Sequence, residues 1–266
     1  TPLIDPEWLS ANRTELVICD TRWYLDGRSG RDAYDADHVE GAVFVDLDTD
    51  LSAPAGVAGR HPLPSPEDFA AAMGRLGIAD DDVVVAYDDA GGMVAARLWW
   101  MLDAIGVSAA VLDGGIQAWT EPLTTERSRR APTTFTPRPW PADRFVTADQ
   151  VASLEENVRL IDARSHERYA GAENAVDPRF GHIPGAISAP FADNLEDGRF
   201  RTPADLADHY AARSITVDTS TVAYCGSGVS ACTDLLALRL AGVRDLRLYV
   251  GSWSEWGADP DRPLER

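Results

Sequence analysis

The stretch STVAYCGSGVSACTDLLALRLAG, from Ser220 to Gly242, joins an apolar run to a helical pattern through a short loop of glycines and serines. STVAY is predicted to form a buried strand, and the segment from Ala231 a helix with Gly242 at its C-terminal cap. A strand that leads directly into a helix is typical of a mainly parallel sheet with helices on its faces. Cys225 therefore falls at the carboxyl end of a strand, where active residues gather in such sheets.

The loop around Cys225 has the composition of an anion-binding nest. A short loop that feeds a helix N-terminus turns its backbone N–H groups inward, and glycines leave the bowl free of side chains. Such surroundings stabilise a thiolate and lower the pKa of the cysteine from about 8.5. The sequence therefore predicts a nucleophile at Cys225. The neighbours expected to hold it or to bind the substrate are Gly226, Ser227, Gly228, Val229 and Ser230.

Two other chemistries that use an anion-binding loop do not fit. A tyrosine phosphatase needs Cys-x5-Arg, but the sixth residue after Cys225 is Ala231. A Walker loop needs a lysine, and the chain has none. The other two cysteines, Cys19 and Cys232, lie within a predicted strand and a predicted helix, where we interpret them as small apolar core residues.

The chain contains an internal repeat. LVICDTRWYLDGRSGRDAYDADHVEGAVFVDLD, from Leu16, corresponds to RLIDARSHERYAGAENAVDPRFGHIPGAISAPF, from Arg159. VVVAYDDAGGMVAARLWWML corresponds to STVAYCGSGVSACTDLLAL, and LDGGIQAW to YVGSWSEW, in the same order. This predicts two homologous α/β domains, 1–121 and 145–266. The proline-rich segment 122–144 shows neither helical nor strand periodicity and is predicted to be a linker.

Composition narrows the partners and the compartment. The 266 residues carry a net charge of −19, which argues against a nucleic-acid partner. No apolar run is long enough to span a membrane. Three irregularly spaced cysteines fit neither a disulfide framework nor a zinc site, so we expect a reducing, cytoplasmic setting and no metal.

The repeat, the HIPGA motif at 182–186, the degenerate HVEGA at 38–42 and the CGSGVSAC loop together resemble the rhodanese (sulfurtransferase) family in its tandem two-domain form. The resemblance covers nearly the whole chain and implies two rhodanese-like domains, each a mainly parallel sheet flanked by helices. Asp88 matches Cys225 in the first domain. Because an aspartate cannot form a persulfide, the first domain is expected to be an inactive copy and the second the catalytic one.

The loop indicates the sulfur donor. Family members that use thiosulfate resemble Cys-Arg-Lys-Gly-Val-Thr at this place, whereas Cys-Gly-Ser-Gly-Val-Ser is similar to the loop of members that use 3-mercaptopyruvate. The resemblance then implies that Cys225 takes the sulfur of 3-mercaptopyruvate as a persulfide, releases pyruvate, and passes the sulfur to cyanide or to a thiol such as thioredoxin or a small thiol, with no cofactor. The alternatives are a thiosulfate sulfurtransferase and a non-catalytic persulfide carrier or interaction module.

The resemblance also suggests residues outside the loop. Arg168 and Arg179 match the arginines that bind the donor carboxylate in the family, a task that suits a planar guanidinium. Ser227 matches a serine that forms a relay with a histidine and an aspartate, for which the candidates are His61 and Asp48. An ordinary surface histidine beside a proline is the alternative for His61.

Overall fold

The structure, a computed structural model, describes residues 1–266. The chain contacts divide it into two compact units. The first comprises Thr1–Ala53 and Leu63–Trp140, and the second comprises Pro54–Pro62 and Pro141–Arg266. The short segment Pro54–Pro62 thus belongs to the second unit, although it lies in the first half of the sequence. The domain boundaries predicted from the sequence are contiguous and do not separate this segment from the first domain.

The first unit is built on a five-stranded parallel sheet in the order β1-β5-β4-β2-β3. Its strands are β1 (Leu3–Ile4), β2 (Val17–Asp20), β3 (Val43–Phe44), β4 (Val84–Tyr87) and β5 (Ala109–Leu112). Its helices are α1 (Pro6–Asn12), α2 (Gly30–Ala36), α3 (Pro66–Arg75) and α4 (Ala95–Ala104). The buried Leu9 of α1 and Tyr34 of α2 share one core with strand residues, while α4 packs on β4 and β5.

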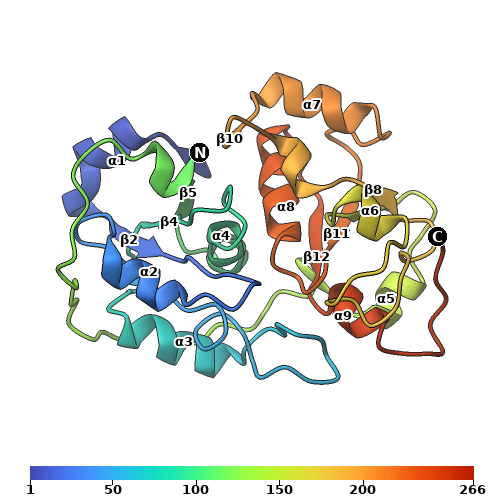
Figure 1. The fold of residues 1–266 in the computed structure, drawn as a ribbon, viewed down its shortest axis with the longest axis horizontal. Helices are drawn as coiled ribbons and strands as arrows, with labels where there is room; N and C mark the ends of the chain where they lie inside the picture. The colour runs from blue at the N-terminus through green and yellow to red at the C-terminus, as the bar shows by residue number, and fades with distance from the viewer. The chain divides into compact units, whose positions relative to one another are not determined.

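The second unit repeats this plan, with the strand order β6-β12-β11-β7-β8 and all pairs parallel. Its strands are β6 (Phe145–Val146), β7 (Arg159–Asp162), β8 (Ile187–Ser188), β11 (Thr221–Tyr224) and β12 (Leu246–Tyr249), with a separate hairpin of β9 (Leu195–Glu196) and β10 (Arg199–Phe200). Its helices are α5 (Ala148–Ala152), α6 (His166–Tyr169), α7 (Pro203–Ala211), α8 (Ala231–Leu240) and α9 (Ser252–Trp256). Within this unit, α7 and α8 lie to one side of the strands, and α5, α6 and α9 to the other (Figure 1).

Besides the same strand order, each unit contains the same two kinds of side-chain contact at equivalent positions. In the first, Arg22 pairs with Asp20 at 2.7 Å; in the second, Arg164 pairs with Asp162 at 2.6 Å. A histidine stacks on a tyrosine in each, His38 on Tyr34 and His182 on Tyr169, with ring centroids 3.8 and 3.7 Å apart. Equal strand order and equal buried pairs confirm the predicted pair of α/β domains.

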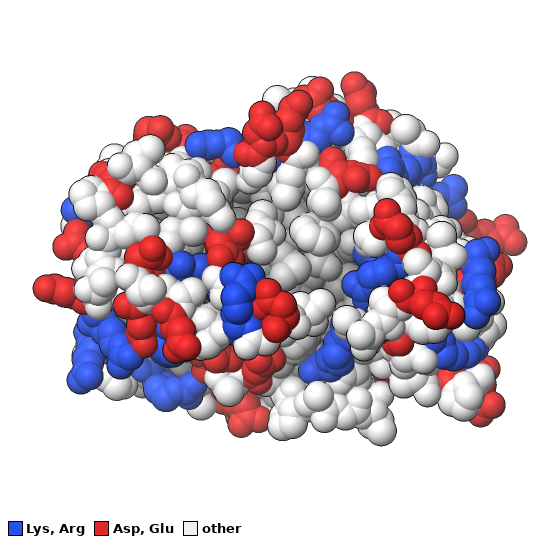
Figure 2. All heavy atoms as spheres, viewed as in Figure 1, with Lys and Arg blue, Asp and Glu red and all other residues white.

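Acidic side chains are spread over the face of the molecule seen in Figure 2, with arginines scattered among them, as the net charge of −19 requires. None of the helices is both long enough and apolar enough to cross a membrane. The three cysteines are buried, and none of them forms a disulfide.

Candidate active site

Cys225 directly follows β11, a strand whose four residues are all buried, and is itself only 2% exposed. Helix α8 begins at Ala231, so the loop between them holds only the residues from Cys225 to Ser230. The α8 residues from Ala231 to Leu238 are buried, which anchors the loop at its far end. A buried strand and a buried helix thus hold the sulfur in one place.

Donors from the loop converge on the sulfur of Cys225. Burial by itself raises the pKa of the thiol, but hydrogen bonds from the Ser230 hydroxyl and from the backbone amides of Ser227, Val229 and Ala231 outweigh it, so the pKa lies below its ordinary value. Cys19, buried without such donors, has its pKa raised by burial. The arrangement therefore favours a thiolate at Cys225 and a neutral thiol at Cys19.

The first turn of α9 forms a second support for the loop. The backbone amides of Trp253 and Ser254 donate to the carbonyls of Cys225 and Gly226 at 3.0 and 2.9 Å, and the amide of Cys225 donates to the Ser252 hydroxyl at 3.1 Å. These bonds fix the backbone on both sides of the sulfur.

A glycine is required at position 228, where the Val250 carbonyl approaches the loop backbone. Its φ is +74°, and a Cβ at this position would lie 2.4 Å from the carbonyl oxygen of Val250. Both the left-handed backbone and the neighbouring carbonyl exclude a side chain here.

The segment Pro54–Pro62 brings a histidine to the loop. The imidazole Nδ1 of His61 lies 2.8 Å from the hydroxyl oxygen of Ser227, and both residues are buried. Asp48, the third member suggested for this relay, belongs to the first unit, where the indole N–H of Trp23 donates to its carboxylate at 3.0 Å.

Arg168 lies over the cysteine loop. Its Nε and Nη2 donate to the two carboxylate oxygens of Asp177 at 2.9 and 2.5 Å, which fixes the orientation of the guanidinium. An ideal Cβ on Gly226 would lie 3.0 Å from Nη2 of Arg168. The absence of a side chain at Gly226 therefore makes room for this cation.

The guanidinium of Arg179, which the resemblance suggests as a ligand of the donor carboxylate, is bound by backbone carbonyls. Its Nε donates to the carbonyl of Gly257, and its Nη2 points to three carbonyls, those of Trp256, Asp259 and Arg262. These groups follow or end α9, where the carbonyls of a helix terminus lack intrahelical donors. The guanidinium therefore satisfies the C-terminal segment, and the geometry gives no support to the role suggested by the sequence.

A second arginine over the loop was missed from the sequence. Nη2 of Arg60 lies 2.8 Å from the ideal Cβ position of Gly226, and Nη1 donates to the carbonyl of Val176 at 2.9 Å. The sequence held one hint, because Arg60 directly precedes His61. Nothing local distinguishes it from the other arginines, however, since its proximity to Cys225 depends on tertiary packing.

The equivalent loop of the first unit is filled by its own side chain. Asp88 follows β4 as Cys225 follows β11, and its carboxylate accepts hydrogen bonds from the amides of Ala90, Gly92, Val94 and Ala95 at 2.8 to 3.0 Å. Burial raises the pKa of this carboxyl, while the amides act in the opposite direction. The nest that surrounds a thiolate in the second unit here surrounds a tethered carboxyl group, which offers no sulfur nucleophile.

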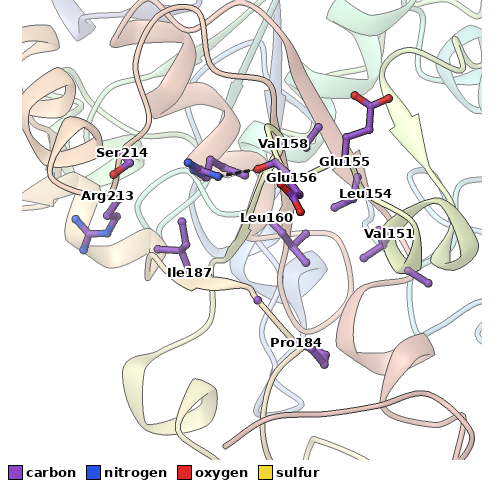
Figure 3. A pocket seen from close by; sticks show the side chains of 13 residues that line it. Val151, Leu154, Glu155, Glu156, Val158, Leu160, Pro184, Ile187, Arg213 and Ser214 are labelled. Atoms are coloured by element: carbon purple, nitrogen blue, oxygen red, sulfur yellow. Dashed lines mark hydrogen bonds between the residues drawn. The ribbon is translucent and has the colours of Figure 1, made fainter.

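A separate open groove of about 530 Å³ lies in the second unit, between α5, β7 and residues 184–187 and 213–214 (Figure 3). Arg159 donates to the Glu156 carbonyl at its edge, and Glu155 and Arg213 also line it. It includes no residue of the cysteine loop and is therefore separate from the surroundings of Cys225.

The fold and the loop together define the class of protein: a duplicated parallel α/β fold in which one of the two equivalent loops favours a thiolate. The model of the rhodanese-like domain matches residues 5–122 and 147–259. The chain is 44% identical to a probable 3-mercaptopyruvate sulfurtransferase of Pseudomonas aeruginosa, over 98% of this chain and 97% of that protein. It is 40% identical to a putative thiosulfate sulfurtransferase, SseB, of Mycobacterium tuberculosis, over 94% and 90%.

Solved structures agree with the sequence relatives. The crystal structure of SseA from Escherichia coli, described as a 3-mercaptopyruvate sulfotransferase with the rhodanese fold, superposes with a TM-score of 0.84 at 32% identity, over 96% of this chain and all of that one. The chain therefore belongs to the rhodanese-like family, in its tandem form, and is a sulfurtransferase. The predicted family and fold are confirmed.

Proposed function

We propose that this sulfurtransferase moves sulfur from 3-mercaptopyruvate, through a persulfide on Cys225, to a thiol acceptor. The observation that carries the proposal is the set of donors around the Cys225 sulfur, from the Ser230 hydroxyl and three backbone amides, which lowers the thiol pKa. The names of the relatives support this donor, since proteins 44% and 34% identical in Pseudomonas aeruginosa and Escherichia coli are called 3-mercaptopyruvate sulfurtransferases.

The first half-reaction begins with attack of the Cys225 thiolate on the thiol sulfur of the donor. An S–S bond forms, the C–S bond breaks, and its electron pair leaves with pyruvate as the enolate. One proton then converts the enolate to pyruvate, and the Ser227 hydroxyl, paired with the His61 imidazole at 2.8 Å, is the group we assign to supply it. The loop amides that stabilise the thiolate then surround the persulfide.

In the second half-reaction an acceptor thiolate attacks the outer sulfur of the persulfide and regenerates the Cys225 thiolate. We assign this role to thioredoxin or a small thiol, in a reducing cytoplasm that fits three cysteines without disulfides. Arg168 orients the donor carboxylate. Gly226, Gly228 and Val229 are the loop residues that we assign to contact the donor. Asp48 is assigned as the acidic member of the relay. Residues 145–266, with Pro54–Pro62, form the catalytic part, and the remainder of residues 1–121 forms the inactive copy.

The test measures pyruvate release and the mass of the intact protein after exposure to 3-mercaptopyruvate. Wild type should gain one sulfur and release pyruvate continuously when a thiol is present. Cys225→Ser should do neither, whereas Cys19→Ser and Cys232→Ser, which change cysteines outside the loop, should retain most activity. Turnover by Cys225→Ser would overturn the proposal, and one added sulfur without continuous pyruvate release would identify a carrier instead of an enzyme.

A further inference from the structure

Arg60 is a half-buried cation for which the structure shows no carboxylate partner. One nitrogen, Nη1, donates to the Val176 carbonyl at 2.9 Å, while Nε is buried without any hydrogen-bond partner. By contrast, Arg168 has Asp177 at 2.5 Å, and Arg164 has Asp162 at 2.6 Å. A half-buried guanidinium without a carboxylate partner is less well compensated than these two, so an anion brought beside Arg60 would stabilise it.

The direction in which Arg60 points identifies that anion. The ideal Cβ position of Gly226 lies 2.8 Å from Nη2 of Arg60 and 3.0 Å from Nη2 of Arg168. Two guanidinium groups therefore lie beside the same point, the place where a side chain of the residue after Cys225 would begin. Burial lowers the pKa of Arg60, and the negative charge of a Cys225 thiolate acts in the opposite direction.

We propose that Arg60 and Arg168 form a two-guanidinium clamp over Gly226 that binds the anionic group of the sulfur donor, so that Arg60 determines which donors reach Cys225. Through Arg60, the segment Pro54–Pro62 adds a positive charge beside the loop, whose own residues Gly226 and Ser227 are neutral. The inference rests on the proposed role of Cys225 as the nucleophile. In this proposal Arg60 takes the role of second ligand for the donor anion, which the resemblance suggests for Arg179. The guanidinium of Arg179 donates instead to carbonyls of the C-terminal segment.

Alkylation tests the clamp without any turnover. Iodoacetate and iodoacetamide react with the same thiolate and are similar in size, but only iodoacetate carries a carboxylate. The ratio of their rates at Cys225, divided by the same ratio for free cysteine, therefore reports anion binding beside the sulfur and is independent of the thiolate fraction. Wild type should show a ratio above one. Arg60→Met should lower it about tenfold or more, the factor expected for loss of a charge-assisted contact.

Two further variants and one control complete the design. Arg60→Lys keeps the charge without the planar fork and should fall between wild type and Arg60→Met. Gly226→Ala keeps both arginines but places a methyl group 2.8 Å from Nη2 of Arg60, so it should lower the ratio by displacing the clamp. Arg213→Met, which removes a part-buried arginine bound to the Ser188 and His209 carbonyls, should leave the ratio unchanged.

The outcomes separate the clamp from the function it deepens. A ratio that stays at the wild-type value in both Arg60→Met and Gly226→Ala would overturn the clamp, even if wild type releases pyruvate normally. Failure of the function itself would appear as turnover by Cys225→Ser. Because Arg60 also holds the Val176 carbonyl, Arg60→Met is compared with wild type by thermal unfolding. If it does not fold, Gly226→Ala decides alone.

Discussion

His61 and Ser227, 166 positions apart in the chain, form a buried hydrogen bond of 2.8 Å between the imidazole Nδ1 and the hydroxyl oxygen. The bond lies next to the loop amides that hold the Cys225 sulfur. A proton of the Ser227 hydroxyl can thus be exchanged with the imidazole, two residues along the chain from Cys225. Such a pair suits the protonation of a leaving enolate.

Replacing His61 by Asn should lower kcat for 3-mercaptopyruvate about 100-fold or more, the usual contribution of a positioned proton donor. The chain offers a matched control. His166 Nδ1 also lies 2.8 Å from a serine hydroxyl, that of Ser188, but this pair is exposed and distant in sequence from the loop. His166→Asn should retain activity. Steady-state pyruvate release measures both variants, and equal rates in His61→Asn and wild type would remove His61 from the relay.

Loss of the Ser230 hydroxyl should make Cys225 a weaker nucleophile near neutral pH. The folded-state pKa of Cys225 is lowered, so reactivity falls as the pH drops through that pKa and is full above it. Ser230→Ala removes a donor to the sulfur and should shift the midpoint of the pH profile for iodoacetamide alkylation upward. Ser153→Ala, which removes an exposed hydroxyl bonded to the Asp149 carbonyl, is the control. An unchanged midpoint in Ser230→Ala would contradict the assigned hydrogen bond.

Gly228→Ala should destabilise the fold far more than Gly185→Ala. Both glycines have φ of +74°, so both substitutions bear the strain of a left-handed alanine, about 1–2 kcal/mol. A Cβ at Gly185 meets nothing within 4 Å, whereas at Gly228 it lies 2.4 Å from the Val250 carbonyl oxygen. That clash should add about 1–3 kcal/mol. Chemical denaturation of the two variants gives the difference directly, and equal midpoints would show that the loop is looser than the structure indicates.

Arg168 and Arg179 should separate into a binding role and a structural one. Arg168→Lys should raise KM for 3-mercaptopyruvate about 10- to 100-fold through loss of the planar contact, while a charge remains beside Asp177. Arg179→Ala should leave KM unchanged and lower the free energy of unfolding, because carbonyls at and after the end of α9 lose their donor. A large rise in KM for Arg179→Ala with normal stability would restore the role suggested by the sequence.

The repeat, the cysteine loop and the position of Arg60 differ in how far the sequence predicts them. The repeat predicts two sheets of equal strand order, since homologous segments bury their apolar faces in the same way. The sequence also indicates Cys225 as the candidate nucleophile, because the glycines and serines that surround it are adjacent in the chain. The sequence does not indicate Arg60, because its proximity to Gly226 depends on how Pro54–Pro62 packs within the second unit. Every basic residue in the chain is an arginine, so residue type alone could not select it.

Beside the anion binding proposed for the clamp, the need for a proton also distinguishes the two donors. With thiosulfate, Cys225 attacks the outer sulfur and sulfite leaves as a stable dianion, so no protonation is required. With 3-mercaptopyruvate, the leaving group is an enolate that must gain a proton, and the Ser227–His61 pair is in position to supply it. We predict that wild-type kcat/KM for 3-mercaptopyruvate exceeds that for thiosulfate by at least about tenfold, or about 1.4 kcal/mol in transition-state binding.

Ser227→Ala tests this reasoning with both donors on one variant. It removes the hydroxyl but leaves Cys225, its amide donors and both arginines of the clamp in place. Turnover with 3-mercaptopyruvate should fall about 100-fold, whereas turnover with thiosulfate, which needs no proton, should change little, so the preference narrows or reverses. An equal loss with both donors would assign Ser227 to the support of the thiolate instead of to the proton. A wild-type preference for thiosulfate would show that the clamp, and not the relay, decides the donor.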